Sequence, residues 1–353
     1  MLNIQNLLIE FFEKNASDLH LVSGLPPMYR IDGEIVSTKY EVLTEDSCKN
    51  LIYTLLNDIQ KEMFETRHEL DFSVEVKGKG HVRVNVYKER GAVGAALRAL
   101  PKKIFSFEEL NLPPVVNDLM KLDRGLVLVT GATGSGKTTT LISMLDYLNQ
   151  SRTSHIVTVE DPIEYIHEHK KSIVTQREVG TDTHSFPAAL KYSLRQDPDI
   201  ILVGEMRDLE TISAAITIAE TGHLVFATLH TNDAPSSINR MIDVFPPHQQ
   251  AQIRAQLSLV IEAVITQQLL PHISGTGRVL ACEVLIATPG IRNLVREMKV
   301  EQIYLAMQTG AKFGMQTMNQ SLCDLYNRKK ISYETAMEYA EDKDGLKRIM
   351  PTC

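Results

Sequence analysis

The sequence predicts an α/β protein in which a domain built on a parallel sheet follows a smaller α+β domain. Three observations carry this prediction. A glycine-rich loop, Gly131–Thr138, stands between a short apolar strand and a helical segment. Further apolar strands alternate with helical segments after the loop. Within residues 1–100 the hydrophobic period changes from that of a helix to that of antiparallel strands.

The first predicted domain, residues 1–100, begins with an amphipathic helix over residues 3–14. Short strands are expected next, at residues 17–22, 28–31 and 34–36, with a hairpin turn at Asp32-Gly33. Thr44 is the expected N-cap of a helix that runs through Leu56, and a second helical piece spans residues 62–69. Three alternating strands complete this domain, at residues 70–76, 81–88 and 93–99.

Residues 101–114 contain three prolines and little periodicity, and we interpret them as a linker. The second domain, residues 115–287, has apolar strands without polar alternation, which is typical of a parallel sheet covered on both faces. Its strands are expected at residues 126–130, 156–160, 200–205, 224–229 and 278–286, and its helices at residues 115–122, 185–195, 209–220 and 254–269. Residues 288–353 are predicted to form a helical tail. Its first helix begins at Thr288-Pro289 and ends at Gly310, and further helices are expected at residues 315–328 and 332–341.

The composition is that of a globular protein, and it limits the possible partners. The chain has 353 residues, 43% of them hydrophobic, and a net charge of −7, which argues against a general attraction to nucleic acid. No apolar run is long enough for a transmembrane segment, and the start lacks the features of a signal peptide, so we expect a soluble cytoplasmic protein. The four cysteines are scattered and are expected to be free thiols: Cys48, Cys282, Cys323 and Cys353.

The loop Gly131–Thr138 fits the phosphate-binding pattern G-x-x-x-x-G-K-[ST] at every fixed position. Its glycines let backbone N–H groups point at a phosphate, and the following helix adds the partial positive charge of its N-terminus. Lys137 is expected to reach the β- and γ-phosphates of ATP, and the hydroxyl of Thr138 to bind Mg²⁺. The expected nucleotide contacts are Thr133, Gly134, Ser135, Gly136, Lys137, Thr138 and Thr139.

Two acidic segments that follow predicted strands are candidates for chemistry. The strand at residues 200–205 ends in Glu205, where a carboxylate can reach Mg²⁺ or a water molecule. Residues 160–164 (EDPIE) bring three carboxylates together after another strand, and Glu164 is the candidate for orienting the attacking water. A solvated strand end and a charged surface turn are the plain alternatives for these two segments.

Histidines and arginines complete the candidate set. His223 and His230 stand at the two ends of the predicted strand 224–229; His230 is a candidate γ-phosphate sensor, and His223 a weaker nucleotide contact. Guanidinium groups can offset the negative charge that develops on a γ-phosphate, and an ordinary surface salt bridge is the alternative for each of them. The candidates are Arg195, Arg207 and Arg240 in the second domain and Arg83 and Arg98 in the first.

Together these segments resemble the type II/IV secretion ATPase superfamily over nearly the whole chain. The phosphate-binding loop matches its Walker A motif, and residues 160–164, 204–208 and 221–232 match its Asp box, Walker B segment and His box. Within the superfamily the chain resembles the branch of type IV pilus retraction ATPases. Residues 16–21 favour that branch, as do residues 290–297 (GIRNLVRE), which differ from its AIRNLIRE signature at Gly290 and Val295.

The resemblance implies a PAS-like N-terminal domain, a RecA-like ATPase domain and assembly as a homohexameric ring that uses ATP and Mg²⁺. It implies that Arg83 and Arg98 reach a nucleotide of the neighbouring subunit, and that Thr138 and Glu205 serve the metal ion. It also implies a place at the inner-membrane base of the pilus, where the ring acts on a platform protein and, in some systems, works beside an accessory retraction ATPase. The helix at residues 291–297 is interpreted as a transmission element, with an ordinary amphipathic helix as the alternative.

Four other interpretations stay open at this point. An extension or secretion ATPase shares the motifs, but typically carries an extra N-terminal domain and a four-cysteine zinc site that this sequence lacks. An accessory retraction ATPase is hard to separate by sequence. A RecA-like nucleic-acid translocase is disfavoured by the acidic charge and the absence of tryptophan. A nucleotide-gated binding module would lack hydrolysis, whereas Glu205 and Glu164 are both present.

Overall fold

The computed structural model describes residues 2–31, 33–100 and 103–350. The chain divides into two compact units: residues 1–103 with 162–166, and residues 104–161 with 167–353. The division between residues 103 and 104 lies within the segment predicted as a linker. The C-terminal part of that segment packs into the second unit, where Phe107 and Leu112 are buried. The predicted turn at Asp32-Gly33 lies partly outside the described residues. The two units are described separately below.

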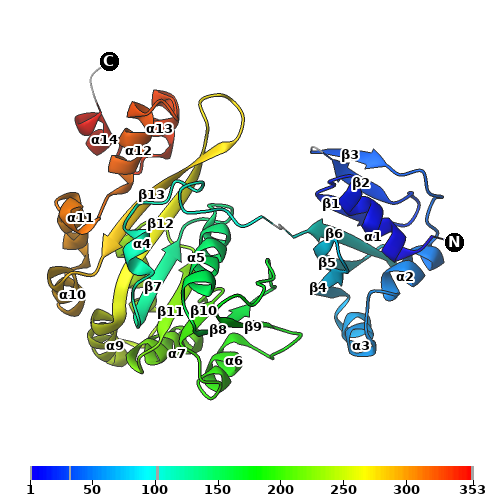
Figure 1. Cartoon of the computed structure of the whole chain (residues 1–353), viewed down its shortest axis with the longest axis horizontal. Coiled ribbons are helices and arrows are strands. Elements are labelled where there is room, and N and C mark those ends of the chain that lie inside the picture. Colours follow the sequence, from blue (N-terminus) through cyan, green and yellow to red (C-terminus); the bar gives the residue numbers. More distant parts are fainter. Residues whose placement is uncertain (1, 32, 101–102, 351–353) are drawn as a thin grey trace. The chain divides into compact units, whose positions relative to one another are not determined.

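The first unit is a six-stranded antiparallel sheet with helices packed on one face (Figure 1). Its strand order is β3-β2-β1-β6-β5-β4. The strands are β1 (Asp18–Leu21), β2 (Met28–Ile31), β3 (Glu34–Ser37), β4 (Glu69–Val76), β5 (Gly80–Glu89) and β6 (Ala92–Ala99). The helices are α1 (Ile4–Glu13), α2 (Glu45–Tyr53) and α3 (Asp58–Arg67). Apolar side chains of these helices share one core with the inner face of the sheet.

Local sequence signals explain where these helices begin. The hydroxyl of Thr44 accepts a hydrogen bond from Ser47 N, and Ser47 Oγ accepts one from Thr44 N, which forms a capping box at the start of α2. Asn57 and Gln60 form a second such box, so α3 begins four residues before the predicted helical piece. Glu69 was predicted as helical, but it begins β4, because His68 takes a left-handed conformation that ends α3.

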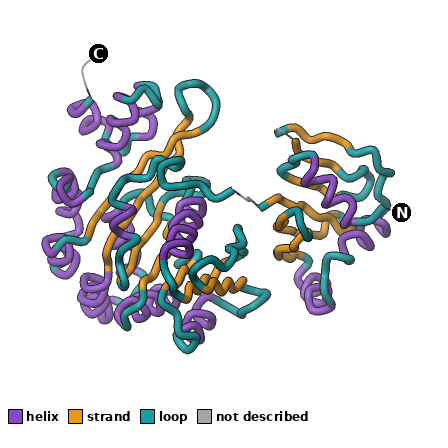
Figure 2. The backbone as a smooth tube through the Cα atoms, in the orientation of Figure 1, coloured by secondary structure: helices purple, strands orange, loops and turns teal. Residues whose placement is uncertain are grey.

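The second unit is built on a seven-stranded sheet in the order β13-β12-β7-β11-β10-β8-β9. Figure 2 shows the strands in orange and the helices beside them in purple. Every neighbouring pair is parallel except β12 and β13. The strands are β7 (Gly125–Thr130), β8 (His155–Glu160), β9 (Ile173–Glu178), β10 (Ile200–Val203), β11 (Leu224–Leu229), β12 (Ile261–Pro271) and β13 (Arg278–Ile286). All residues of β7, β10 and β11 are buried, as expected for central strands covered on both faces.

Helices cover both faces of this sheet. Leu126 and Leu128 of β7 face one apolar core, and Val127 and Val129 face the other. The first core includes residues of α6 (Phe186–Ser193), α7 (Leu209–Glu220), α8 (Ala234–Asp243), α9 (Pro247–Val260), α10 (Pro289–Arg296) and α11 (Ile303–Gln308). The second includes residues of α4 (Val116–Leu119) and α5 (Lys137–Ser151). A smaller core joins β12 and β13 to α12 (Met318–Asn327), α13 (Tyr333–Tyr339) and α14 (Lys343–Ile349).

The helix predicted over residues 254–269 is wrong in its second half. Helix α9 runs from Pro247 to Val260, and β12 begins at Ile261. Apart from Glu262, the run Ile261–Thr266 is apolar or β-branched, so its periodicity does not separate a buried helix from a buried strand. Pairing with β7 decides the conformation, because β12 extends the parallel sheet beside the strand that leads into the glycine-rich loop.

Substituting Gly290 by Ala is expected to stabilise the protein slightly. Gly290 lies in the first turn of α10, and an added Cβ would meet only Thr288 Oγ1, at 3.8 Å. Alanine loses less backbone entropy than glycine in a helix, so the free energy of unfolding should rise by up to about 1 kcal/mol. Chemical denaturation of both proteins measures the change. Gly310→Ala is the contrasting variant, because its Cβ would approach Met315 Sδ to 2.5 Å and should destabilise the protein.

The described residues contain free cysteines but neither a membrane-spanning helix nor a cluster of metal-binding side chains. Among residues 2–31, 33–100 and 103–350, no helix combines the length and apolar character needed to cross a membrane. Cys48, Cys282 and Cys323 are buried free thiols, as predicted, whereas Cys353 lies outside the described residues. No group of three or more cysteine, histidine or acidic residues in the described part of the chain is arranged to hold a metal ion.

Candidate functional site

The glycine-rich loop connects β7 to α5 and is held in a conformation that its glycines permit. Gly131, Gly134 and Gly136 have φ angles of 136°, 80° and 96°, which side chains with a Cβ rarely adopt. A Cβ on Gly131 would lie 2.4 Å from Gln267 O and 2.6 Å from Ser135 Oγ. The loop therefore requires glycine at this position both for its backbone angle and for its close approach to β12.

Lys137 and the start of α5 form a cradle for an anion. The buried ammonium of Lys137 donates hydrogen bonds to Gly131 O at 2.7 Å and Ala132 O at 3.0 Å, which folds the side chain back over the loop. No side chain caps the start of α5, where Gly136 is the N-cap. First-turn N–H groups without a side-chain cap, combined with the helix dipole and a lysine, are the features of a phosphate site.

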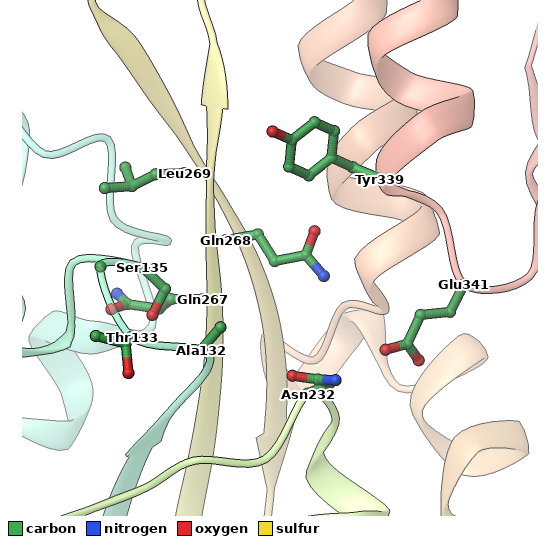
Figure 3. Close-up of a pocket in the computed structure, with 10 residues that line it drawn as sticks. Ala132, Thr133, Ser135, Asn232, Gln267, Gln268, Leu269, Tyr339 and Glu341 are labelled. Atoms are coloured by element: carbon green, nitrogen blue, oxygen red, sulfur yellow. The ribbon is translucent and has the colours of Figure 1, made fainter.

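A pocket of about 380 Å³ opens beside this loop (Figure 3). One wall is the loop itself, and the other walls come from three distant parts of the second unit: the segment after β11, the end of β12 and the C-terminal helices. The lining residues are Ala132, Thr133, Gly134, Ser135, Asn232, Gln267, Gln268, Leu269, Tyr339 and Glu341. The side chain of Glu341 extends toward Asn232 in this view. A phosphate-bearing ligand on the loop would lie at the edge of this pocket.

Glu205 lies just after β10, at the same carboxyl edge of the sheet as the loop. Its Oε1 accepts hydrogen bonds from Arg207 Nε at 2.6 Å and from His230 Nε2 at 3.1 Å. Burial raises the pKa of Glu205, but the hydrogen bond from Arg207 and the charges of both partners outweigh it, so the pKa lies below its usual value. The carboxylate is therefore ionised at neutral pH and is held in place from two sides.

Hydrogen bonds around the strand ends fix this arrangement. The hydroxyl of Thr228 donates to Gly204 O, and Met206 N donates to Thr228 O at 3.1 Å. These bonds join the segment after β10 to β11, the strand that precedes His230. At the end of β8, Glu160 accepts hydrogen bonds from Thr158 at 2.6 Å and Gln176 at 3.1 Å. The first acid of residues 160–164 thus has a structural position beside β9.

The structure places His223 and Arg195 at the edge of the sheet opposite the glycine-rich loop of their own subunit. His223 precedes β11, and its carbonyl accepts a hydrogen bond from Gly125 N at the start of β7. The six-residue strand β7 separates this edge from the loop by roughly 17–20 Å. His223 Nδ1 instead contacts Ile218 O at 3.0 Å, near the end of α7. Arg195 lies between α6 and β10, at the same far edge, and is exposed. The nucleotide roles of both residues therefore stay predictions, with the loop of their own subunit at the opposite edge of the sheet.

A buried chain of hydroxyl groups near the loop was not predicted from sequence. Thr130, the last residue of β7, has its Oγ1 2.8 Å from that of Thr266 on β12, and Ser237 Oγ of α8 lies 3.4 Å from Thr130 Oγ1. Thr231 Oγ1 lies 2.6 Å from Ser237 Oγ. Nearby, Gln267 Nε2 donates to Thr140 Oγ1 at 2.8 Å. The available signal was the presence of Thr130 and Thr266 beside apolar residues of β7 and β12, since buried hydroxyls need partners.

Three further predicted site residues, Arg83, Arg98 and Glu164, belong to the first unit. Arg83 and Arg98 face each other directly across β5 and β6. Arg98 Nε donates to Asp18 Oδ1 at 2.8 Å, and Arg83 Nε lies 3.7 Å from Asp71 Oδ1. Glu164 belongs to residues 162–166, which group with this unit. The roles assigned to these three residues at the nucleotide therefore stay predictions.

Comparison with known proteins gives a consistent result. The model of the family described as "Type II/IV secretion system protein" matches residues 2–332. The chain is 51% identical over 340 residues to "Type IV pilus retractation ATPase PilT" of Pseudomonas aeruginosa, covering 96% of this chain and 98% of that protein. It is 40% identical to "Type IV pilus ATPase PilU" of the same organism, covering 99% and 91%.

Among solved structures, "Crystal Structure of the Pilus Retraction Motor PilT and Bound ADP" is 50% identical, with a TM-score of 0.92 and coverage of 99% of this chain and 100% of that one. The Legionella pneumophila ATPase DotB is 26% identical, with a TM-score of 0.86 and coverage of 96% and 95%. The predicted fold, a mixed α/β architecture with further helices, agrees with these neighbours. By its family match and by its identity to relatives over almost its full length, the chain belongs to the type II/IV secretion system protein family.

Proposed function

We propose that this protein hydrolyses ATP and uses the energy to retract type IV pili, as the motor of twitching motility. The observation that carries hydrolysis is the pairing of an anion cradle, formed by Lys137 and the uncapped start of α5, with the carboxylate of Glu205 at the same sheet edge. The observation that carries pilus retraction is the full-length similarity to PilT, including a solved relative that holds ADP.

The chain's residues support a division of labour in this reaction. Lys137 and the loop N–H groups bind and orient the β- and γ-phosphates. The carboxylate of Glu205 can accept a proton at the sheet edge beside the glycine-rich loop. His230 and Arg207 keep this carboxylate oriented and ionised. His230 contacts Glu205 and stands directly after β11, so it can respond to the γ-phosphate. Glu164 is the further candidate for orienting water.

The residues present fit Mg²⁺ as the accompanying cation. Thr138, in the first turn of α5, and Glu205 offer the hard oxygen atoms that this ion prefers, and their strands lie two places apart in the sheet. A site with only one or two protein oxygens is typical of Mg²⁺ bound chiefly by phosphates and water. When bound, Mg²⁺ would neutralise negative charge that develops on the phosphates.

We further propose a homohexameric ring at the cytoplasmic side of the inner membrane, in which Arg83 and Arg98 complete the nucleotide site of the next subunit. A phosphate held between two rigid bodies keeps them together, and its release would let the two bodies move relative to each other. The ring would pass this movement to an inner-membrane platform protein through the α10 segment. There, Arg292 donates to Leu259 O at 2.9 Å and to Glu262 Oε1 at 2.8 Å, which fixes α10 to the start of β12.

Deleting the gene tests this function. A retraction motor predicts cells that carry excess pili and cannot twitch, because extension continues without removal. The wild-type gene should restore twitching, and a gene carrying Lys137→Ala should not. Pilus counts by electron microscopy and subsurface twitching zones measure both. Cells without pili would instead indicate an extension ATPase, and twitching restored by the Lys137→Ala gene would contradict the role of the loop.

An accessory retraction ATPase is the second candidate, favoured by the similarity to PilU over 99% of this chain. The identity to PilT is higher, at 51% against 40%, which favours the main motor. Complementation of strains that lack one or the other retraction ATPase separates the two, since an accessory protein should not restore twitching on its own.

A further inference from the structure

A carboxylate is buried among the strands and helices behind the nucleotide pocket. Glu283 lies in the middle of β13, is 2% exposed and stands directly opposite Thr266 of β12. A buried acid without partners would be costly, so its contacts are informative. None of the motifs found in the sequence includes this residue.

Both carboxylate oxygens of Glu283 accept hydrogen bonds from the first residue of a helix. Oε1 accepts from Ala234 N at 2.7 Å, and Oε2 accepts from Met318 N at 3.3 Å. Ala234 begins α8 and Met318 begins α12, so the negative charge meets the positive ends of two helix dipoles. One side chain therefore joins two helices that are far apart in the sequence.

The first of these helices is connected to the phosphate-binding loop. Helix α8 follows the His-box residues Thr231 and Asn232, and its Ser237 links Thr231 to Thr130 through hydroxyl contacts of 2.6 and 3.4 Å. Thr130 immediately precedes Gly131 of the loop and also contacts Thr266, the cross-strand neighbour of Glu283. Glu283 thus neighbours, through Thr266 and through the start of α8, a hydroxyl network that reaches the root of the loop.

The second helix belongs to the C-terminal wall of the pocket. Helix α12 packs with α13 and α14 in one apolar cluster. Tyr339, the last residue of α13, and Glu341 line the pocket opposite the loop, where Glu341 extends toward Asn232 (Figure 3). The separation between Asn232 and this wall depends on how α8 and α12 are held together.

We propose that Glu283 is a positioning residue: its ionised carboxylate ties the starts of α8 and α12 together, so that the His-box loop and the C-terminal wall keep a fixed separation beside the phosphate-binding loop. This inference rests on the proposed ATP hydrolysis. It assigns to the C-terminal helices a direct effect on turnover, through one buried group that touches neither nucleotide nor metal.

The surroundings of Glu283 make this connection sensitive to pH. Burial raises its pKa to about 7, against the two backbone hydrogen bonds that lower it, and the charges of Asp233 and Glu341 raise it further. Tyr304 of α11 also faces it, and the Glu283 charge contributes to a raised pKa of that phenol. Protonation would place a donor where an N–H group needs an acceptor, so the connection is complete only above about pH 7.

The test compares wild type with Glu283→Gln, using MgATP as substrate over about pH 6–8. The ratio of wild-type kcat to variant kcat should rise several-fold across this range, because only the wild type gains a charged acceptor, while KM for ATP stays within about twofold. The stability of the wild type relative to the variant, measured by thermal unfolding, should change with pH in the opposite direction. The folded pKa lies above the unfolded value of 4.5, so wild-type stability relative to the variant should fall as pH rises from about 4.5 to 7.

Two further variants separate this role from general damage. Asp233→Asn keeps the N-cap of α8 but removes a like charge, so the midpoint of the kcat profile should move to lower pH. Glu338→Gln, an exposed position on α13, should leave the profile unchanged. A kcat ratio that is constant with pH, or a midpoint unmoved by Asp233→Asn, would overturn the inference. A wild-type protein without ATPase activity would instead refute the proposed function.

Discussion

Replacing Glu205 by Gln is expected to lower ATP hydrolysis by about 10²–10³-fold while ATP binding remains. The amide keeps the shape of the side chain but removes the charge that accepts hydrogen bonds from Arg207 and His230. The phosphate-binding contacts of Lys137 and the start of α5 do not involve this residue. The chemical step should therefore fail without loss of the ligand.

Phosphate release and isothermal titration with ATP measure the two effects separately. Glu220→Gln is the matched control, because Glu220 ends α7 at the far edge of the sheet, where its carboxylate accepts a hydrogen bond from Gln256 at 2.8 Å. Since the pKa of Glu205 is lowered from 4.5, wild-type activity should not be limited by its protonation at any pH above about 4.5. Unchanged phosphate release by Glu205→Gln would indicate a nucleotide-gated module without turnover.

The sequence was most informative where local signals and tertiary packing agree. Helix α7 has its predicted bounds because Asp208 caps it and an apolar stripe faces the sheet. The loop after β7 was predicted completely, since its glycines are required locally. Strand β9 and helices α8 and α14 were missed. The first residues of α8, Ala234-Pro235-Ser236-Ser237, look like a loop, and tertiary bonds to Glu283 and Thr130 fix their conformation.

The site was less predictable than the loop because its other parts are joined only in three dimensions. Arg207 and His230 can reach Glu205 because β10 and β11 are neighbouring parallel strands, whose carboxyl ends lie at the same edge of the sheet. The alternation of strands and helices in the sequence predicted this edge. His223 lies at the opposite end of β11 from His230, because a motif gives proximity in sequence but not the direction of a strand. Gln267 and Glu283 lacked any motif, and β12 had been predicted as helical, so its pairing with β13 could not be anticipated.

Replacing Arg98 by Ala is expected to reduce hydrolysis at least about a hundredfold if this arginine completes a neighbouring subunit's site, as we propose. Arg98 is 72% exposed and donates a hydrogen bond to Asp18. Burial raises the pKa of Asp18, but its hydrogen bonds, including the one from Arg98, outweigh this effect, so the pKa lies below its usual value. Most of its surface is therefore available to a second subunit. Arg30→Ala is the matched control, because Arg30 also approaches Asp18, at 3.6 Å, from the next strand.

Mixing inactive proteins distinguishes action between subunits from action within one. Lys137→Ala removes the ammonium at the phosphate-binding loop but keeps Arg98, whereas Arg98→Ala keeps the loop. If the two residues meet across an interface of a homohexamer, equal mixing with subunit exchange should leave about a quarter of the interfaces with both groups intact. Phosphate release should then recover to about that fraction of the wild-type rate. If both residues act within one subunit, no mixture can recover, and a monomer that hydrolyses ATP at the wild-type rate would exclude the ring motor altogether.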